Sequence, residues 1–84
     1  MYKIIVSKTA SKELEDLPTQ AVNRIIPVIM KLGQDPRPPG CKKLKGERDS
    51  WRIRIGDYRV IYAIEDAVSI VDVRSVGHRK DIYQ

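Results

Sequence analysis

The chain has 84 residues, a formal net charge of +5, one cysteine and one histidine. This length predicts a single small domain, residues 1–84, with a modest core. One cysteine excludes an internal disulfide framework, and one cysteine with one histidine cannot complete a structural zinc site, so no metal or cofactor is expected. No apolar run is long enough to span a membrane, and Met1 leads directly into a strand-like segment without a signal peptide, which together favour a cytoplasmic location.

The N-terminal region predicts a strand followed by a helix. Residues 2–6, YKIIV, form a β-branched run that favours a strand. A helix is expected over residues 8–17, because Ser7 or Thr9 can accept a hydrogen bond as its N-cap. Pro18 lacks a backbone N–H and is expected to end this helix.

A second helix is predicted from apolar side chains spaced at 3.6 residues, beginning at Thr19 as its cap and ending at Gly33. The two helices form a hairpin whose apolar stripes need a sheet to cover them. In the first predicted helix, Glu13, Glu15 and Asp16 form a small acidic group, which we interpret as a solvated face.

The segment WRIRIGDYRVIY, residues 51–62, predicts a β-hairpin. Apolar residues alternate with other residues on both sides of Gly56-Asp57, which is typical of strands with two different faces. A two-residue loop that begins with glycine suits a type II′ turn, because glycine takes a positive φ at no steric cost. With this turn Ile53 lies opposite Val60, and the apolar side chains form one packing surface.

The other surface of the hairpin is rich in arginine, and we call it the arginine face. Arg54 is expected directly opposite Arg59, with Arg52 beside them. Like charges opposite each other across strands are destabilising by up to about 1 kcal/mol. The pattern therefore indicates either a functional requirement or a solvated outer face, because arginine tolerates sheet surfaces.

A third strand is expected over residues 67–76, joined to the hairpin by a turn at Glu65-Asp66. A turn centred there places Asp72 opposite Arg59, with Arg74 on the same face. The predicted fold class is α+β: an N-terminal strand, a helical hairpin and an antiparallel three-stranded meander, forming a twisted sheet with the two helices on one face.

The excess positive charge lies in one segment of the chain. Residues 37–59 hold eight basic and three acidic residues, and the remaining residues are balanced in charge. This distribution indicates a polyanionic partner, and nucleic acid is favoured over a membrane because the basic residues lie on a loop and a hairpin and not on an amphipathic helix. The candidate RNA-binding residues are Lys42, Lys43, Lys45, Arg48, Arg74 and Lys80.

The available chemistry is limited to guanidinium groups, one imidazole and a tyrosine near the C-terminus. Gly77 predicts a bend that returns His78, Arg79 and Lys80 to the arginine face. The sequence has no GxSxG motif, no glycine-rich phosphate loop and no metal-ligand cluster. The groups present can bind phosphate, stabilise a pentacoordinate phosphorus and move a proton. RNA carries its own 2′-hydroxyl nucleophile, so these groups favour metal-free cleavage of RNA over DNA.

The order of motifs resembles the RelE family of toxins, in the RelE/ParE superfamily of bacterial and archaeal toxin–antitoxin systems. The matching motifs are K-L-K-G at residues 43–46, W-R-I-R followed by D-Y-R-V-I-Y at residues 51–62, and the closing V-G-H-R-K-D-I-Y. The resemblance implies a ribosome-dependent mRNA endoribonuclease (an mRNA interferase) that inhibits translation. In such enzymes the 2′-hydroxyl attacks the neighbouring phosphate and leaves a 2′,3′-cyclic phosphate and a 5′-hydroxyl.

The resemblance also implies roles for individual residues. Arg52 and Arg54 match two basic residues, lysines in the best-studied member, that activate the nucleophile and bind phosphate. Arg59 matches an arginine that stabilises the transition state. Arg79 matches the arginine implicated in protonating the leaving oxygen, and Tyr83 matches a tyrosine that orients the RNA.

The departures from the family pattern leave the general base open. Arginine stays protonated in proteins, so Arg52 and Arg54 are poor bases. Either His78 takes the proton, or catalysis rests on electrostatics, or activity is weak.

Two alternatives to RNA cleavage also remain: a ParE-like inhibitor of DNA gyrase, and a catalytically weak RNA-binding relative. Each toxin reading implies a cognate antitoxin in a hetero-oligomer. An acidic or amphipathic segment of that antitoxin is expected to cover the apolar helix edges or mask the basic face.

Overall fold

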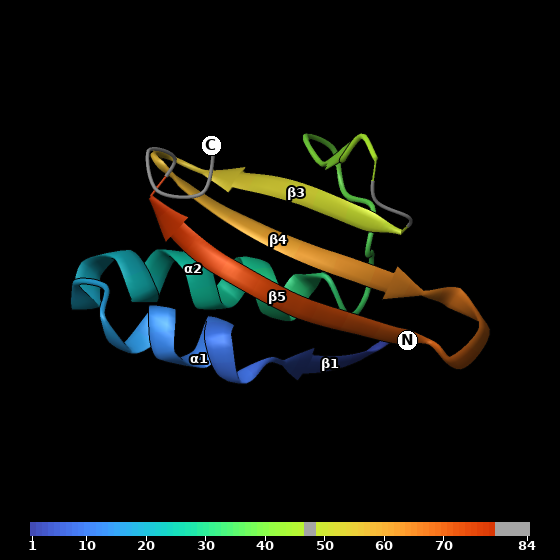
Figure 1. Ribbon diagram of the computed structural model, residues 1–84, viewed down its shortest axis with the longest axis horizontal. Coiled ribbons are helices and arrows are strands. Elements are labelled where there is room, and N and C mark those ends of the chain that lie inside the picture. The colour runs from blue at the N-terminus through green and yellow to red at the C-terminus, as the bar shows by residue number, and fades with distance from the viewer. Residues whose placement is uncertain (47–48, 79–84) are drawn as a thin grey trace.

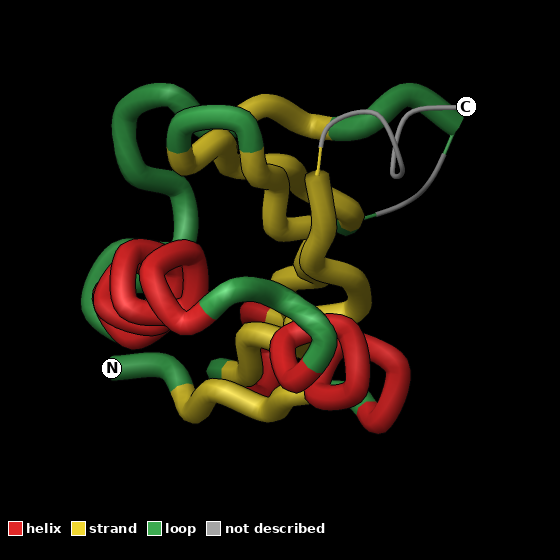
Figure 2. The backbone as a smooth tube through the Cα atoms, turned by 90° about the vertical axis from the view of Figure 1, so that its left-hand side faces the viewer, coloured by secondary structure: helices red, strands yellow, loops and turns green. Residues whose placement is uncertain are grey.

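The computed structural model describes residues 1–46 and 49–78. Its elements are β1 (Lys3–Val6), α1 (Lys8–Glu15), α2 (Thr19–Lys31), β2 (Lys42–Lys43), β3 (Ser50–Ile55), β4 (Tyr58–Glu65), the 3-10 turn η1 (Asp66–Val68) and β5 (Ile70–His78). The strands form one sheet in the order β1-β5-β4-β3-β2, in which β1 runs parallel to β5 and the other neighbours are antiparallel. Figure 1 shows β3, β4 and β5 as long, twisted neighbours, and Figure 2 shows the two helices packed against the curved strand layer. The predicted α+β class is confirmed, with β2 as a strand where the sequence predicted a loop.

The core lies between the helices and the apolar side of the sheet. Ile25, Val60, Tyr62 and Val73 are each 0% exposed, and they belong to one buried cluster that also contains Ala10 of α1. Each fully buried large apolar side chain contributes about 1.5–3 kcal/mol, so this cluster is the main source of stability. The predicted 3.6-residue stripe and the predicted strand alternation therefore meet at one surface.

The helix ends follow local rules, with two differences from prediction. Ser7 caps α1, because its Oγ accepts a hydrogen bond from the N–H of Ala10 at 3.0 Å. α1 ends at Glu15, two residues before the predicted end at Leu17, and Pro18 occupies the N-cap position of α2. Thr19 is the first helical residue and makes no side-chain cap bond, so the prediction of Thr19 as the cap is wrong. The extended backbone of Pro18, with ψ 146°, already provides the turn between the helices.

The register of the first hairpin is confirmed. Ile53 pairs with Val60, and Arg54 pairs with Arg59. Gly56 has φ 60°, whereas Asp57 is not among the residues with positive φ, which is the pattern of a type II′ turn.

The predicted register of the second hairpin is wrong. Arg59 lies opposite Gly77, and Asp72 lies opposite Ala63. The connection is longer than the predicted two-residue turn, since it contains η1 and then Ser69 in the left-handed region at φ 55°. Asp72 does not reach Arg59; its Oδ2 lies 3.5 Å from Nε of Arg74 on the same strand.

A polar cluster joins the start of the chain to the proline-rich loop before β2. Asp66 Oδ1 accepts a hydrogen bond from the Tyr2 hydroxyl at 2.5 Å, and Asp66 Oδ2 accepts one from Arg37 Nη2 at 2.9 Å. The same guanidinium lies over Trp51, with Cζ 5.1 Å from the ring centroid. Arg37 thereby ties the loop to η1 and β3, and this loop leads directly to β2.

We expect Asp66→Asn to remove part of the stability of the folded chain at neutral pH and to flatten its acid denaturation. Hydrogen bonds from Arg37 and then from Tyr2 hold the pKa of the Asp66 carboxyl below its ordinary value. The stabilisation is therefore present when the pH lies above the unfolded-state pKa of about 4. It is lost as the pH falls through the lowered folded-state pKa. Urea denaturation between neutral and acid pH measures it, with the exposed neighbour variant Glu65→Gln as control. If the free energy of unfolding fell with pH equally in the wild type and in Asp66→Asn, the stabilising role of the Asp66 carboxylate would be contradicted.

Candidate nucleic-acid interface

Two rows of residues cross the sheet on the face opposite the core. The rows follow from the strand pairing, because paired residues point to the same face and successive residues alternate. In strand order the first row is Arg54, Arg59 and Gly77, and the second is Lys42, Arg52, Ile61 and Ser75. The predicted arginine face is therefore present and is extended by Lys42.

The three arginines of this face differ in exposure. Arg52 and Arg59 are each 7% exposed, whereas Arg54 is exposed. The interpretation as a simple solvated surface therefore fits Arg54 alone of the three. The charge of a buried guanidinium acts in a medium of lower dielectric constant than water. The arrangement can stabilise negative charge more strongly than surface lysines can.

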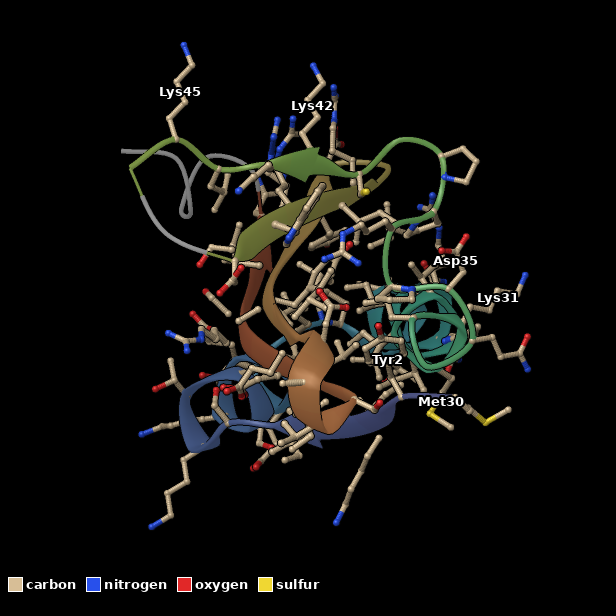
Figure 3. All side chains as sticks on the ribbon, turned by 90° about the vertical axis from the view of Figure 1, so that its right-hand side faces the viewer. Tyr2, Met30, Lys31, Asp35, Lys42 and Lys45 are labelled. Carbon is tan, nitrogen blue, oxygen red and sulfur yellow. The ribbon has the colours of Figure 1, made fainter. Side chains whose placement is uncertain are left out.

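The three lysines around Leu44 separate in the structure. Lys42 pairs with Arg52 and shares the arginine face, whereas Lys43 pairs with Trp51 and belongs to the opposite face. Lys45 follows β2, and all three lysines are exposed. Figure 3 shows Lys42 and Lys45 pointing away from the helices. Lys42 thus lies on the arginine face, and Lys43 lies on the opposite face.

Two further basic residues lie elsewhere. Arg74 is exposed beside the irregularity in β5 and faces Asp72, apart from the first row. Sequence reasoning missed Arg24 of α2, whose guanidinium covers the hairpin turn: a β-carbon on Gly56 would lie 2.9 Å from Arg24 Nη2. Arg24 adds positive charge at the hairpin tip, and no sequence signal indicates this, because the proximity depends on how α2 packs.

His78 lies differently from its predicted position. The predicted bend at Gly77 is absent, since β5 continues through Gly77 to His78. His78 pairs with Tyr58, and the two rings meet edge to face at a centroid distance of 5.6 Å. Because successive residues alternate, this half-buried imidazole belongs to the face opposite Arg59.

Four predicted site residues, Arg48, Arg79, Lys80 and Tyr83, lie outside the described residues, and their roles stay predictions. Within residues 1–46 and 49–78, no group of three or more His, Cys, Asp or Glu side chains could hold a metal ion. In the same part of the chain, no helix has the length and apolar character needed to cross a membrane.

Comparison with known protein families shows which family the chain belongs to. A family model described as the ParE toxin of type II toxin–antitoxin systems, parDE, matches residues 4–83. The chain belongs to the RelE/ParE superfamily of toxins. It is 33% identical over 85 residues to toxin RelE3 of Methanocaldococcus jannaschii, covering 96% of this chain and 94% of that protein. It is 31% identical over 84 residues to toxin RelG of Mycobacterium tuberculosis, covering 99% and 97%.

Solved structures place this RelE/ParE toxin among RelE folds. A chain of the RelBE2 toxin–antitoxin complex of Mycobacterium tuberculosis superposes with a TM-score of 0.83 at 28% identity, covering 93% of this chain and 98% of that one. The isolated RelE toxin of E. coli superposes with a TM-score of 0.81 at 26% identity, covering 93% and 84%. The resemblance to RelE inferred from the motifs is therefore confirmed.

Proposed function

We propose that this RelE/ParE toxin is a ribosome-dependent endoribonuclease that cleaves mRNA. The observation that supports it most directly is the first row of the arginine face, where Arg54 lies beside the nearly buried Arg59. Two like charges held side by side are unfavourable for folding alone, and a bound phosphate removes that repulsion. Exposed Lys42 and Lys45 supply contacts to neighbouring phosphates.

In the proposed reaction the 2′-hydroxyl oxygen bonds to the adjacent phosphorus while the bond from phosphorus to the 5′ oxygen breaks. The 2′-hydroxyl loses a proton and the 5′ oxygen gains one, leaving a 2′,3′-cyclic phosphate and a 5′-hydroxyl. Arg59 stabilises the charge that develops on the phosphoryl oxygens, and Arg52 and Arg54 hold the phosphate. By the family resemblance, Arg79 protonates the leaving oxygen and Tyr83 orients the RNA.

The position of His78 bears on the general base. Its ring packs on Tyr58, on the side of the sheet opposite Arg59. This supports electrostatic stabilisation over proton transfer to His78 as the main source of catalysis. Fixed guanidinium groups need no reorganisation as negative charge develops, so they can lower the barrier without a side-chain base.

Inhibition of DNA gyrase is the second candidate function, because the matching family model is described as ParE. One experiment separates the two. The toxin is induced without its antitoxin, the 5′ ends of cellular messages are mapped, and purified toxin is added to a gyrase supercoiling assay. Growth arrest with new 5′-hydroxyl ends inside translated codons, and unaffected supercoiling, is the expected result. Intact messages with inhibited supercoiling would replace RNA cleavage by gyrase inhibition.

A cognate antitoxin is the proposed protein partner, since relatives of this chain crystallised as complexes of RelE with RelB. An apolar groove of about 580 Å³ between β1 and α2 can accept part of it. Met30 and Ile26 in its wall are 63% and 39% exposed, and Lys31 also lines it. Tyr2 and Met30 lie on the same side of the molecule in Figure 3. An amphipathic segment with acidic residues beside its apolar stripe fits this lining.

We expect Met30→Glu to weaken antitoxin binding by about 10–100-fold, because burial of one large apolar side chain is worth about 1.5–3 kcal/mol. The added carboxylate would also repel an acidic segment. Calorimetric titration with the cognate antitoxin measures the change, and Met30→Leu serves as the volume-matched control. Equal affinities for the three proteins would place the antitoxin elsewhere.

A further inference from the structure

The outer edge of β5 is completed by α1 after β1 ends. β1 pairs with β5 from Ile70 to Val73. Beyond that point the N–H of Ser7 donates to the carbonyl of Val73 at 2.9 Å, and the Ser7 hydroxyl donates to the carbonyl of Arg74 at 3.1 Å. Figure 1 shows α1 following β1 along this edge. The edge groups of β5 therefore find partners in α1 and its cap.

Glu13 of α1 binds the next two residues of the edge. Its Oε1 accepts a hydrogen bond from the N–H of Val76 at 2.9 Å and another from the Ser75 hydroxyl at 3.1 Å. A weaker contact of 3.4 Å joins the same hydroxyl to Oε2. Glu13 is half-buried, so its interpretation as part of a solvated acidic face is wrong. The partners are 62 and 63 residues away in sequence, which explains why no local pattern indicates them.

These bonds lie where the pairing of β4 with β5 changes register. Tyr62 pairs with Val73, but its neighbour Ile61 pairs with Ser75, so Arg74 is an extra residue in β5. Such a bulge decides which face each later side chain occupies, because a shift of one residue exchanges the faces.

The bulge brings Gly77 opposite Arg59. Without the extra residue, Val76 would take the place of Gly77 and its side chain would lie beside Arg59. Ser75 would then lie opposite Val60, with its hydroxyl facing the apolar core. Glu13 accepts hydrogen bonds from the two residues that immediately follow the extra residue, so it stabilises the bulged register.

We propose that Glu13 is a positioning residue for RNA cleavage: its carboxylate holds the bulged register of β5 that sets Gly77, and not Val76, beside Arg59. This inference rests on the proposed function. Glu13 does not touch RNA and acts through Ser75 and Val76. The essential atom is Oε1, the acceptor of both short hydrogen bonds.

Two substitutions separate hydrogen bonding from charge. Glu13→Ala removes the acceptor, whereas Glu13→Gln retains a side-chain carbonyl oxygen and loses the negative charge. We expect Glu13→Ala to lower the single-turnover rate of cleavage on programmed ribosomes by about 10–100-fold, the scale of a small misplacement of reacting groups. Glu13→Gln is expected to retain most of the rate. Glu15→Ala, an exposed residue of the same helix, is expected to match the wild type.

Amide hydrogen exchange of Val76 provides a second readout that needs no RNA. Val76 should lose protection in Glu13→Ala and keep it in Glu13→Gln. Unchanged rate or unchanged Val76 protection in Glu13→Ala would overturn the inference, as would a Glu13→Gln variant as slow as Glu13→Ala. If Glu13→Ala does not fold, Glu13→Asp, which is one methylene shorter, takes its place. A wild-type chain that cleaves no RNA refutes the proposed function, while unchanged Val76 protection separately refutes the role of Glu13 in the register.

Discussion

Replacing Arg59 with alanine is expected to lower ribosome-dependent RNA cleavage by about 10²–10³-fold, the usual effect of removing one preorganised donor from a developing anion. Arg59 is 7% exposed on the central strand β4, so its guanidinium is held in place before the substrate arrives. It also lies directly opposite Arg54, which concentrates positive charge at one phosphate-sized position. Growth under induction should recover in parallel.

Stability should change much less than activity in Arg59→Ala. Removing one of two facing cations relieves a repulsion of up to about 1 kcal/mol, which offsets lost packing of the side-chain stem. We therefore expect a melting temperature close to that of the wild type. A variant that loses activity only because it unfolds would contradict a catalytic role for Arg59.

Two control variants sharpen the measurement. Arg59→Lys keeps the charge but loses the planar fork of donors, so partial activity is expected. Lys12→Ala removes one exposed charge from α1 and should leave cleavage unchanged. If Lys12→Ala were as slow as Arg59→Ala, total charge and not position would govern the reaction.

The largest effect on stability is expected for Tyr62→Ala, at about 3–5 kcal/mol of unfolding free energy. Tyr62 is 0% exposed on β4, and truncating it leaves a cavity in the centre of the core. Its hydroxyl also donates to the carbonyl of Pro36 at 2.8 Å, which fixes the loop that leads to β2 and Lys42. A domain of this size has about 5–15 kcal/mol in total, so the variant should lose a large part of its stability.

Tyr62→Phe isolates the hydroxyl from the ring. It should cost about 0.5–1.5 kcal/mol, because the ring stays buried and one hydrogen bond is lost.

Burial raises the pKa of the Tyr62 hydroxyl above its ordinary value. Its contribution to stability is therefore complete below about pH 10 and is lost as the pH rises toward the raised pKa, a loss that Tyr62→Phe should lack. Denaturant titrations at neutral and alkaline pH measure both effects. Equal stability of Tyr62→Ala and Tyr62→Phe would contradict the central place of this ring in the core.

The polar cluster around Asp66 and the hydrogen bonds from the β5 bulge to Glu13 share one physical feature. In each case a side chain from the N-terminal half of the chain contacts residues of the C-terminal half. The chain therefore positions its basic surface through contacts between segments that are distant in sequence. Such contacts have no periodic signature, which is why composition and spacing alone do not reveal them.

The amino-acid sequence alone determined the features that depend on neighbouring residues. The glycine at position 56 and the alternation around it specified the first hairpin, including Arg54 opposite Arg59, because a two-residue turn leaves one register. Ser7 and Thr9 were the two candidate caps for the first helix, which begins at Lys8 as predicted, and the order of motifs indicated the RelE/ParE superfamily. The charge count located the basic surface in residues 37–59.

The tertiary structure alone decided the features that depend on long connections. The turn between β4 and β5 is extended by η1 and followed by a bulge, so Arg59 meets Gly77 and not Asp72. The pairing of β2 with β3 brought Lys42 to the arginine face, and helix packing brought Arg24 to Gly56. The burial of Arg52 and Arg59 also depends on how the elements pack, and so do the hydrogen bonds that Glu13 accepts. A local turn has few geometries, whereas a longer loop permits several registers, and the choice among them is made by the edge and core contacts that form at a distance.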